Sequence, residues 1–143
     1  MLKLNTVCTG SSGNCYILED KEEAIIVDAG GVFKSLLKTH PAEFSKCNAA
    51  IITHEHKDHC SLVKDLLKYG IDVYATKGTA SACDFDGDVF YKEIKYKKKY
   101  TIGNFKITPF DTLHDAEEPC GFLIKHIPTK INILYATDTY KIK

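Results

Sequence analysis

Five of six consecutive residues near the middle of the chain carry side chains that commonly bind metal ions. Residues 54–59 read His-Glu-His-Lys-Asp-His, which places three of the six histidines in one short segment. Imidazole nitrogens and carboxylate oxygens are good ligands for zinc and related divalent cations. In an extended loop, His54 and His56 project to one side and can share a metal ion. Asp58 and His59 then point toward a second position. The segment therefore predicts a metal site, with a solvated polar loop as the alternative.

The elements around this segment place it where catalytic loops form. It directly follows the apolar run at residues 49–53 (AAIIT), which is typical of a buried strand. After it, Ser61 is predicted to cap a helix whose apolar face lies within residues 62–67 and which ends at Gly70. In α/β architectures, active sites lie in loops at the carboxyl ends of strands. A zincin helix is excluded, because its motif, His-Glu-x-x-His, requires a histidine where this chain has Asp58.

The other predicted elements alternate between strand and helix in the first half of the chain and are mainly strands in the last third. Apolar runs and alternating patterns predict strands at residues 2–8, 15–19, 24–28, 71–75, 105–111, 120–126 and 131–136. One helix is predicted within residues 31–41, where Pro41 would end it, and a shorter one near residues 77–83. No repeat, low-complexity tract or linker interrupts this pattern, so we expect a single domain over residues 1–143.

The composition is that of a globular domain. The chain has 143 residues and a mass of 16.0 kDa, and its 44% hydrophobic residues are enough to build a core. Its 19 basic and 19 acidic residues balance, which argues against nucleic-acid binding held mainly by bulk charge. No apolar run approaches the roughly 20 residues that span a bilayer, and the N-terminus lacks the apolar run of a secretory signal. We therefore exclude disorder and membrane insertion.

Six cysteines are spread along the chain without a Cys-x-x-Cys pair. Three disulfides are one interpretation of this even number, but such a framework usually accompanies an export signal and a small, loop-rich chain. Most of these cysteines lie in or beside apolar segments, where free cysteine behaves as a small hydrophobic residue. We interpret them as reduced thiols of a cytoplasmic protein.

Motifs along most of the chain resemble those of the metallo-β-lactamase-fold hydrolases. His-x-His-x-Asp-His at residues 54–59, after a buried strand, is similar to the signature of this family. Asp28 resembles the aspartate that braces the metal loop, His114 the third metal-binding histidine, and Asp138 the carboxylate that bridges both metals. The segment SSGNCYIL and the segment from His114 to Phe122 further resemble a subgroup of bacterial and phage phosphodiesterases and exonucleases.

The resemblance implies a hydrolase with two divalent metals. It distributes the ligands as follows: His54, His56 and His114 on the first metal, Asp58 and His59 on the second, and Asp138 as the bridge. Asp58 is in addition the candidate catalytic residue. Zn²⁺ is expected and Mn²⁺ is possible, since histidine-carboxylate sites accept both. A metal-bound hydroxide would be the nucleophile. An aspartate in place of a cysteine at the bridge favours phosphodiester hydrolysis over lactam opening.

Taken singly, three of these residues also have structural explanations. Asp28 could end a strand, His114 could be a polar residue at a strand end, and Asp138 could be an edge or helix-cap residue. Together with residues 54–59 the metal interpretation is favoured, because a metal site needs ligands that converge from distant parts of the chain. His40 and His126 match no ligand of the family, and we interpret both as structural.

The family domain is an αββα sandwich of two similar halves and is longer than this chain. We expect an α+β fold of this type that lacks its C-terminal part, so that the second metal site is short of its last ligand and apolar sheet surface is exposed. A second copy or a separately encoded chain could complete the site. The predicted function is metal-dependent hydrolysis of a phosphodiester in DNA, RNA or a cyclic nucleotide. The alternative is a truncated, non-catalytic metal-binding or assembly module.

A basic run with interleaved tyrosines, residues 95–100 (KYKKKY), allows two interpretations. Its lysines could contact a nucleic-acid backbone while its tyrosines stack on bases. A solvated hairpin that carries charge is the commoner explanation.

Overall fold

Two parallel strands that are buried on both faces lie at the centre of the fold. β3 (Ala24–Ala29) and β4 (Cys47–Ile51) are neighbours in one sheet. Every residue of β3 is buried, because Ile26 faces a layer of helices whereas Ile25 and Val27 face a second sheet. The continuous apolar run that predicted this strand therefore reflects two separate apolar cores, one on each side of it.

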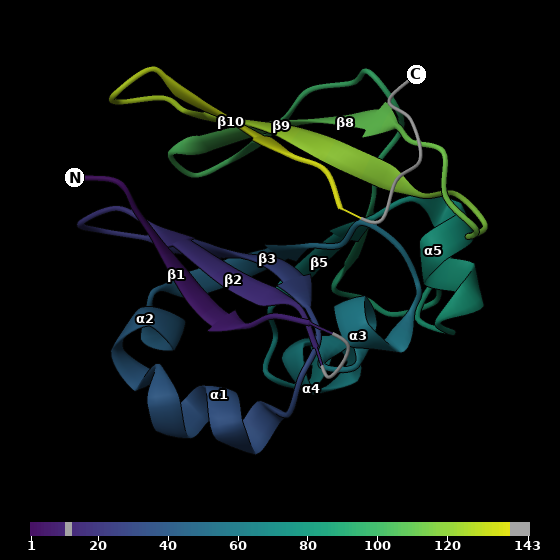
Figure 1. Cartoon of the computed structure of the whole chain (residues 1–143), viewed down its shortest axis with the longest axis horizontal. Coiled ribbons are helices and arrows are strands. Elements are labelled where there is room, and N and C mark those ends of the chain that lie inside the picture. Colours follow the sequence, from purple (N-terminus) through teal and green to yellow (C-terminus); the bar gives the residue numbers. More distant parts are fainter. Residues whose placement is uncertain (11–12, 138–143) are drawn as a thin grey trace.

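The described residues, 1–10 and 13–137 of this computed structural model, form two sheets that pack face to face (Figure 1). The larger sheet has the strand order β1 (Lys3–Cys8), β2 (Cys15–Glu19), β3, β4, β5 (Asp72–Ala75), β6 (Tyr91–Glu93). The smaller sheet has the order β10 (Ile131–Tyr135), β9 (Cys120–His126), β8 (Phe105–Asp111), β7 (Tyr100–Ile102). The smaller sheet is antiparallel, whereas β3 to β6 of the larger sheet are parallel. The carboxyl ends of β3, β4 and β5 therefore lie at the same edge.

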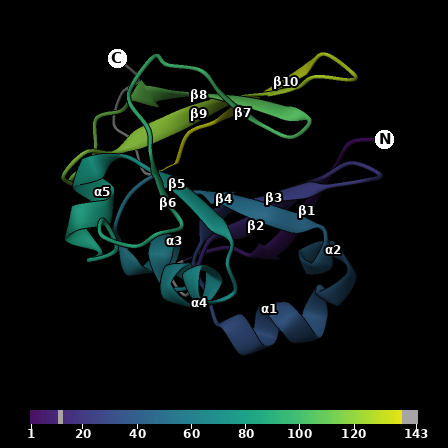
Figure 2. The same ribbon diagram turned by 180° about the vertical axis from the view of Figure 1, so that it is seen from behind.

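Short helices pack around the larger sheet. They are α1 (Phe33–Thr39), α2 (Pro41–Ser45), α3 (Lys57–Cys60), α4 (Val63–Lys68) and α5 (Lys77–Ala82). Figures 1 and 2 show α1 to α4 on the face of the larger sheet that points away from the smaller one, and α5 at the end of the sandwich. These layers confirm the α+β class. None of the described helices is long and apolar enough to cross a membrane.

The outer face of the smaller sheet is open within the described part of the chain. No described helix covers it (Figures 1 and 2), and Leu123 and Leu134 are 41% and 63% exposed there. Exposed apolar surface was expected on this sheet. A second copy or a complementing chain that would cover it stays a prediction, as does the single domain over residues 1–143.

Most predicted strands are present, with small differences at their ends. Those at residues 15–19, 105–111 and 120–126 have the predicted bounds. The short helix near residues 77–83 is also present as α5, and the Thr76 hydroxyl caps its first turn by accepting from the Thr79 N–H. The sequence did not predict β6, β7 or α2. These elements have three to five residues, which is too short for a periodic pattern to be visible.

One prediction about helix ends needs correction and a second is confirmed. The helix predicted after Ser61 is present as α4, but Ser61 does not cap it. Leu62 is at the N-cap position without a side-chain hydrogen bond, and the Ser61 hydroxyl instead donates to the Gly31 carbonyl (2.9 Å). Pro41 does follow the end of α1, but it also begins α2. Proline suits the first helical position, since its missing N–H would have no partner there and its φ is already helical.

The basic run at residues 95–100 connects β6 to β7. The Tyr96 hydroxyl donates to the Pro119 carbonyl (2.7 Å), and the Tyr100 hydroxyl accepts from the Lys95 N–H (2.8 Å). Both tyrosine rings also pack against the core between the sheets. Because these rings contribute to the fold, the structure favours the charged hairpin over a base-stacking surface.

A buried polar cluster joins the two sheets at the amino end of β3. Asp20, in the turn before β3, accepts hydrogen bonds from His126 of β9 (2.9 Å) and from the Asn104 side chain (2.8 Å). Burial alone would raise the pKa of Asp20. These two hydrogen bonds, with those from the Glu23 and Glu22 N–H groups, outweigh burial and hold that pKa below its usual range. His126 therefore has a structural role, as predicted.

We predict that Asp20→Asn lowers the free energy of unfolding by about 1–3 kcal/mol at pH 7, because it removes the charge from a buried hydrogen-bond acceptor. A lowered pKa stabilises the fold above the ordinary carboxyl pKa of about 4, and this contribution is lost as the pH falls through the folded-state value. The difference between variant and wild type, measured by urea unfolding, should therefore shrink on acidification. Asp86→Asn, on an exposed loop, is the control. An equal decrease of the unfolding free energy in the control, or a decrease in Asp20→Asn that does not change with pH, would contradict this account.

Candidate metal centre

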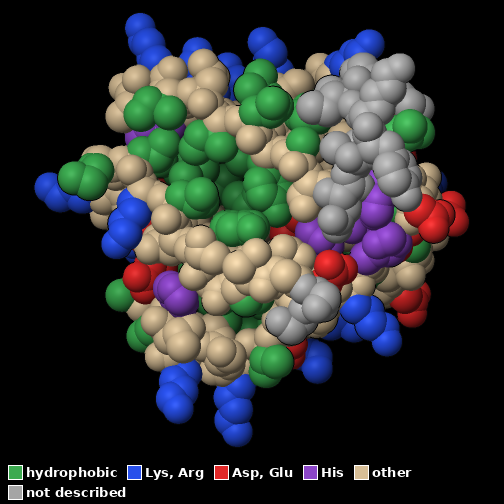
Figure 3. All heavy atoms as spheres, viewed as in Figure 1, with side chains coloured by type: hydrophobic (Ala, Val, Ile, Leu, Met, Phe, Trp, Pro, Cys, Tyr) green, Lys and Arg blue, Asp and Glu red, His purple; other side chains and the backbone are tan. Residues whose placement is uncertain are grey.

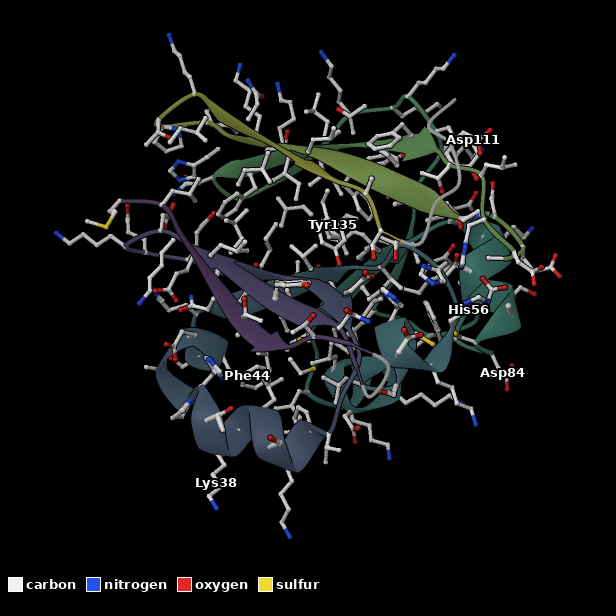
Figure 4. All side chains as sticks on the ribbon, in the orientation of Figure 1. Lys38, Phe44, His56, Asp84, Asp111 and Tyr135 are labelled. Carbon is white, nitrogen blue, oxygen red and sulfur yellow. The ribbon has the colours of Figure 1, made fainter. Side chains whose placement is uncertain are left out.

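The carboxyl ends of β3 and β4 bring the predicted metal-binding residues together. Asp28 lies at the end of β3, and Thr53 and His54 follow β4; all three are buried. Histidine side chains gather at this end of the sandwich, beside acidic side chains (Figure 3). Figure 4 shows His56 there, next to α3 and α5. The parallel pairing of β3 with β4 thus places residues far apart in the sequence at one edge.

Asp28 is a buried hydrogen-bond acceptor at this edge. Its carboxylate accepts from the N–H and the hydroxyl of Thr53 (2.8 and 2.9 Å), from the His59 Nδ1–H (2.8 Å) and from the Tyr135 hydroxyl (2.9 Å). Its φ of 58° is rare for a residue other than glycine. Because His59 donates from Nδ1, its Nε2 carries the lone pair that a metal ion would bind. These contacts agree with the bracing role that the family resemblance implied for Asp28.

The candidate ligands form two groups that share one histidine: His54, His56 and His114 in the first, and His54, Asp58 and His59 in the second. Within each group the possible ligand atoms lie within 4.8 Å of one another. In the first group, Nε2 of His114 lies 3.2 Å from Nδ1 of His56. The first group has the predicted composition. In the second, His54 lies beside Asp58 and His59, although we predicted His54 for the first metal alone.

His54 is buried among other imidazoles. Burial, followed by the nearby rings of His59, His114 and His56, lowers its pKa to about 3, since each effect disfavours a positive charge. His54 is therefore uncharged at neutral pH, and its Nδ1 lies 2.8 Å from the Thr53 hydroxyl. Uncharged imidazoles combined with a carboxylate are a donor set that zinc and manganese accept. The residues present thus fit a divalent metal ion.

Asp58 and His59 lie in a helical turn, α3, and not in the extended loop that we predicted. The Asp58 carbonyl accepts from the Asn14 N–H (2.6 Å), and Gly30 lies directly against the same carbonyl. The Asn14 side-chain amide also donates to the Asp58 carboxylate (3.2 Å) and lies 3.3 Å from Nε2 of His59. Contacts with neighbouring loops therefore fix this turn. The sequence of residues 54–59 alone does not reveal these contacts.

His114 reaches the site from the connection between β8 and β9. Two hydrogen bonds join this connection to the loop after β4. The Cys120 N–H donates to the Thr53 carbonyl (2.9 Å), and the Glu117 N–H donates to the Glu55 carboxylate (2.9 Å). Both sheets therefore contribute candidate ligands, and their relative position sets the geometry of the first group.

Asp138, the predicted bridging residue, lies outside the described residues. The structure brings together the other five residues predicted as ligands: His54, His56, Asp58, His59 and His114. Their roles in metal binding and catalysis stay predictions. So does the expectation that the second site lacks its last ligand.

Three residues of this centre were not singled out from the sequence: Asn14, Thr53 and Tyr135. The Gly-Ser-Ser-Gly-Asn run around Asn14 indicates a turn but not a contact with Asp58. Figure 4 shows Tyr135 of β10 between the two sheets. Burial and the nearby Asp28 charge raise the pKa of Tyr135 above its usual range, so its hydroxyl stays protonated and donates. No local pattern reveals a contact between residues on two different sheets.

Comparison with known proteins identifies the family. Residues 23–143 match the family described as Beta-lactamase superfamily domain. The chain belongs to this family. The fold agrees, since the structure superposes on the metallo-beta-lactamase fold protein YhfI from Bacillus subtilis with a TM-score of 0.77 at 20% identity, covering 95% of this chain and 61% of that one. The metallo-β-lactamase type of fold is thereby confirmed.

Curated relatives of this superfamily chain include nucleases. It is 36% identical to exodeoxyribonuclease WalJ of Streptococcus pneumoniae over 127 residues, which cover 82% of this chain and 47% of the relative. It is 27% identical to exodeoxyribonuclease YycJ of Bacillus anthracis over 150 residues, with 96% and 54% covered. The chain thus spans about half the length of these relatives. The predicted resemblance to the exonuclease subgroup is confirmed, and the fold implies binding of a divalent metal.

We predict that Gly30→Ala weakens metal binding about tenfold or more, because a Cβ at this position would overlap the Asp58 carbonyl and displace the turn that carries two candidate ligands. Isothermal titration of the metal-free protein with Zn²⁺ measures the affinity. Gly87→Ala is the matched control, since no atom lies within 4 Å of a Cβ added there. Equal affinities in the two variants would show that close packing at Gly30 does not position the site.

Proposed function

We propose that this chain forms the metal-binding part of a divalent-metal-dependent nuclease that hydrolyses phosphodiester bonds in DNA. The observation that carries the proposal is the pair of ligand groups around His54, one made of histidines only and the other containing the carboxylate of Asp58. Such paired sites suit in-line displacement at phosphorus. The names of two relatives, both exodeoxyribonucleases, support DNA as the substrate.

We assign one ion to the first ligand group and a second ion to Asp58 and His59, with Asp138 as the bridging ligand. Zn²⁺ is the proposed metal and Mn²⁺ the alternative. When bound, such ions lower the pKa of a water molecule toward about 7 and offset the charge that develops on the phosphoryl group. This assignment keeps the distribution that the family resemblance implied.

Hydrogen bonds from neighbouring side chains orient the proposed ligands of this site. Asp28 orients His59 through Nδ1, and the Asn14 amide holds the Asp58 carboxylate. The Asp58 side chain is 28% exposed, so solvent water reaches it. We propose that Asp58 takes a proton from the attacking water as well as binding metal, because a carboxylate beside the reacting atoms is suited to act as a base.

A non-catalytic metal-binding or assembly module is the second candidate function. The outer face of the smaller sheet favours it, because Leu123 and Leu134 are exposed there and no described helix covers them. Apolar surface of this kind often marks an interaction site. Only the first candidate requires hydrolysis of DNA at the ligand groups, so an activity assay separates the two.

We also propose that the protein works in the cytoplasm. The two exodeoxyribonucleases that it resembles come from bacteria, whose DNA lies in the cytoplasm, and all six cysteines of this chain are free. Thiols stay reduced in that compartment. The proposal therefore agrees with both the substrate and the cysteines.

We predict that the purified chain, with added Zn²⁺ or Mn²⁺, shortens linear DNA, and that His56→Ala and Asp58→Ala each lower the rate about a hundredfold or more. Release of acid-soluble nucleotides from end-labelled single-stranded and duplex DNA measures the rate. The same assay on RNA of equal sequence tests the preference for DNA.

The matched control is His40→Ala, which removes a histidine that lies before α2 and belongs to neither ligand group. It should keep the wild-type rate. Equal hydrolysis by wild type and both site variants would dismiss catalysis at this centre. Absence of hydrolysis by a metal-loaded wild type would favour the assembly module.

A further inference from the structure

Two thiols meet beside the metal loop. Cys60 is the last residue of α3, and Cys83 follows the last turn of α5. Their Sγ atoms lie 3.0 Å apart. Both sulfur atoms also contact the Glu55 carbonyl, at 2.9 Å for Cys60 and 3.5 Å for Cys83. A disulfide bond is about 2.05 Å long, so a shift of roughly 1 Å would join the two sulfur atoms.

This pair is accessible from solvent. Both cysteines are half-buried and line one surface pocket of about 330 Å³ together with Glu55 and Lys64. The other four cysteines of the chain are in different surroundings: Cys15 and Cys120 are buried, and the sulfur atoms of Cys8 and Cys47 contact backbone carbonyls. Cys60 and Cys83 are the pair for which the described structure records direct sulfur–sulfur contact.

The surroundings make Cys83 the more reactive thiol. A hydrogen bond from the Cys60 thiol lowers the pKa of Cys83. Burial and the nearby Glu55 charge oppose this effect, and the Lys64 charge assists it. A lowered pKa increases the fraction of thiolate, which is the nucleophilic form. By contrast, burial raises the pKa of Cys47 to about 12.

We propose that Cys60 and Cys83 form a peroxide-reactive dithiol whose closure to a disulfide distorts the metal loop. The Cys83 thiolate attacks one oxygen of hydrogen peroxide, the O–O bond breaks, and the leaving hydroxide takes up the thiol proton as water. The resulting Cys83 sulfenic acid is then attacked by the Cys60 sulfur, and its hydroxyl leaves as a second water with the Cys60 proton. Two thiols and one peroxide thus give one disulfide and two waters.

The contacts of the pair explain why closure would reach the metal loop. The disulfide leaves neither sulfur atom with a hydrogen to donate to the Glu55 carbonyl, which both sulfur atoms contact and which lies between two candidate ligands in sequence. It also pulls α3, which carries Asp58 and His59, toward α5. The start of α5 is in turn bound to the connection that carries His114, since the Gly78 N–H donates to the Glu118 carboxylate (2.8 Å). One covalent bond therefore acts on both ligand groups.

The first experiment treats the purified, metal-loaded protein with hydrogen peroxide and maps its peptides by mass spectrometry without reduction. We expect a linked peptide pair containing Cys60 and Cys83 that has lost two hydrogen atoms and that dithiothreitol separates. In Cys60→Ser, dimedone should label Cys83 as a trapped sulfenic acid. Cys47→Ser is the matched control and should still form the link. A link between other cysteines, or over-oxidation without any link, would overturn the proposal.

The second experiment tests the effect on the metal loop, which depends on the proposed metal site. Competition with a chromogenic zinc chelator should show affinity reduced about tenfold in the oxidised wild type, recovery after reduction, and no change in peroxide-treated Cys83→Ser. A linked protein with unchanged zinc affinity would refute distortion of the loop. Because the peptide map needs no hydrolysis, failure of the nuclease proposal is distinguishable from failure of this one.

Discussion

The centre depends above all on one buried carboxylate. Asp28 accepts hydrogen bonds from the strand end that leads into the metal loop, from the candidate ligand His59, and from Tyr135 on the second sheet. A buried charge is tolerated only when such hydrogen bonds replace water. The same bonds therefore stabilise the charge and fix three parts of the chain relative to one another. Any displacement of a sheet, a loop or a ligand leaves this carboxylate short of a donor.

Close packing supplies the precision that the carboxylate alone does not. Gly30 and Asn14 lie in two separate turns, and both contact the backbone carbonyl of Asp58. Main-chain contacts therefore position the second ligand group, in addition to the contacts of its side chains. The first group depends on the register of the two sheets, since His114 comes from the smaller one. The thiol pair at Cys60 and Cys83 contacts the Glu55 carbonyl of the same loop. The loop whose contacts position the candidate ligands is therefore also the loop on which the proposed disulfide would act.

Much of this arrangement could be predicted from the sequence. The apolar runs before Asp28 and His54 indicated buried strands, and residues 54–59 have the ligand types themselves. The structure adds that the two strands are parallel, so that their ends meet at one edge. What the sequence did not reveal depends on contacts between distant segments. The helical turn at Asp58 is held by loops far away in the chain, and Tyr135 has no local pattern that points to Asp28. The short strands β6 and β7 exist because longer neighbours pair with them.

The central claim is that the two ligand groups bind divalent metal ions, and metal content measures it most directly. Elemental analysis of the folded, unchelated protein should find at least one zinc or manganese ion per chain, and close to two where a second copy or a complementing chain completes the second site. His59→Ala should retain the first ion and lose the second where it is present, whereas His40→Ala should match the wild type. A folded wild-type protein that contains no metal and binds none on addition of either ion would contradict the account.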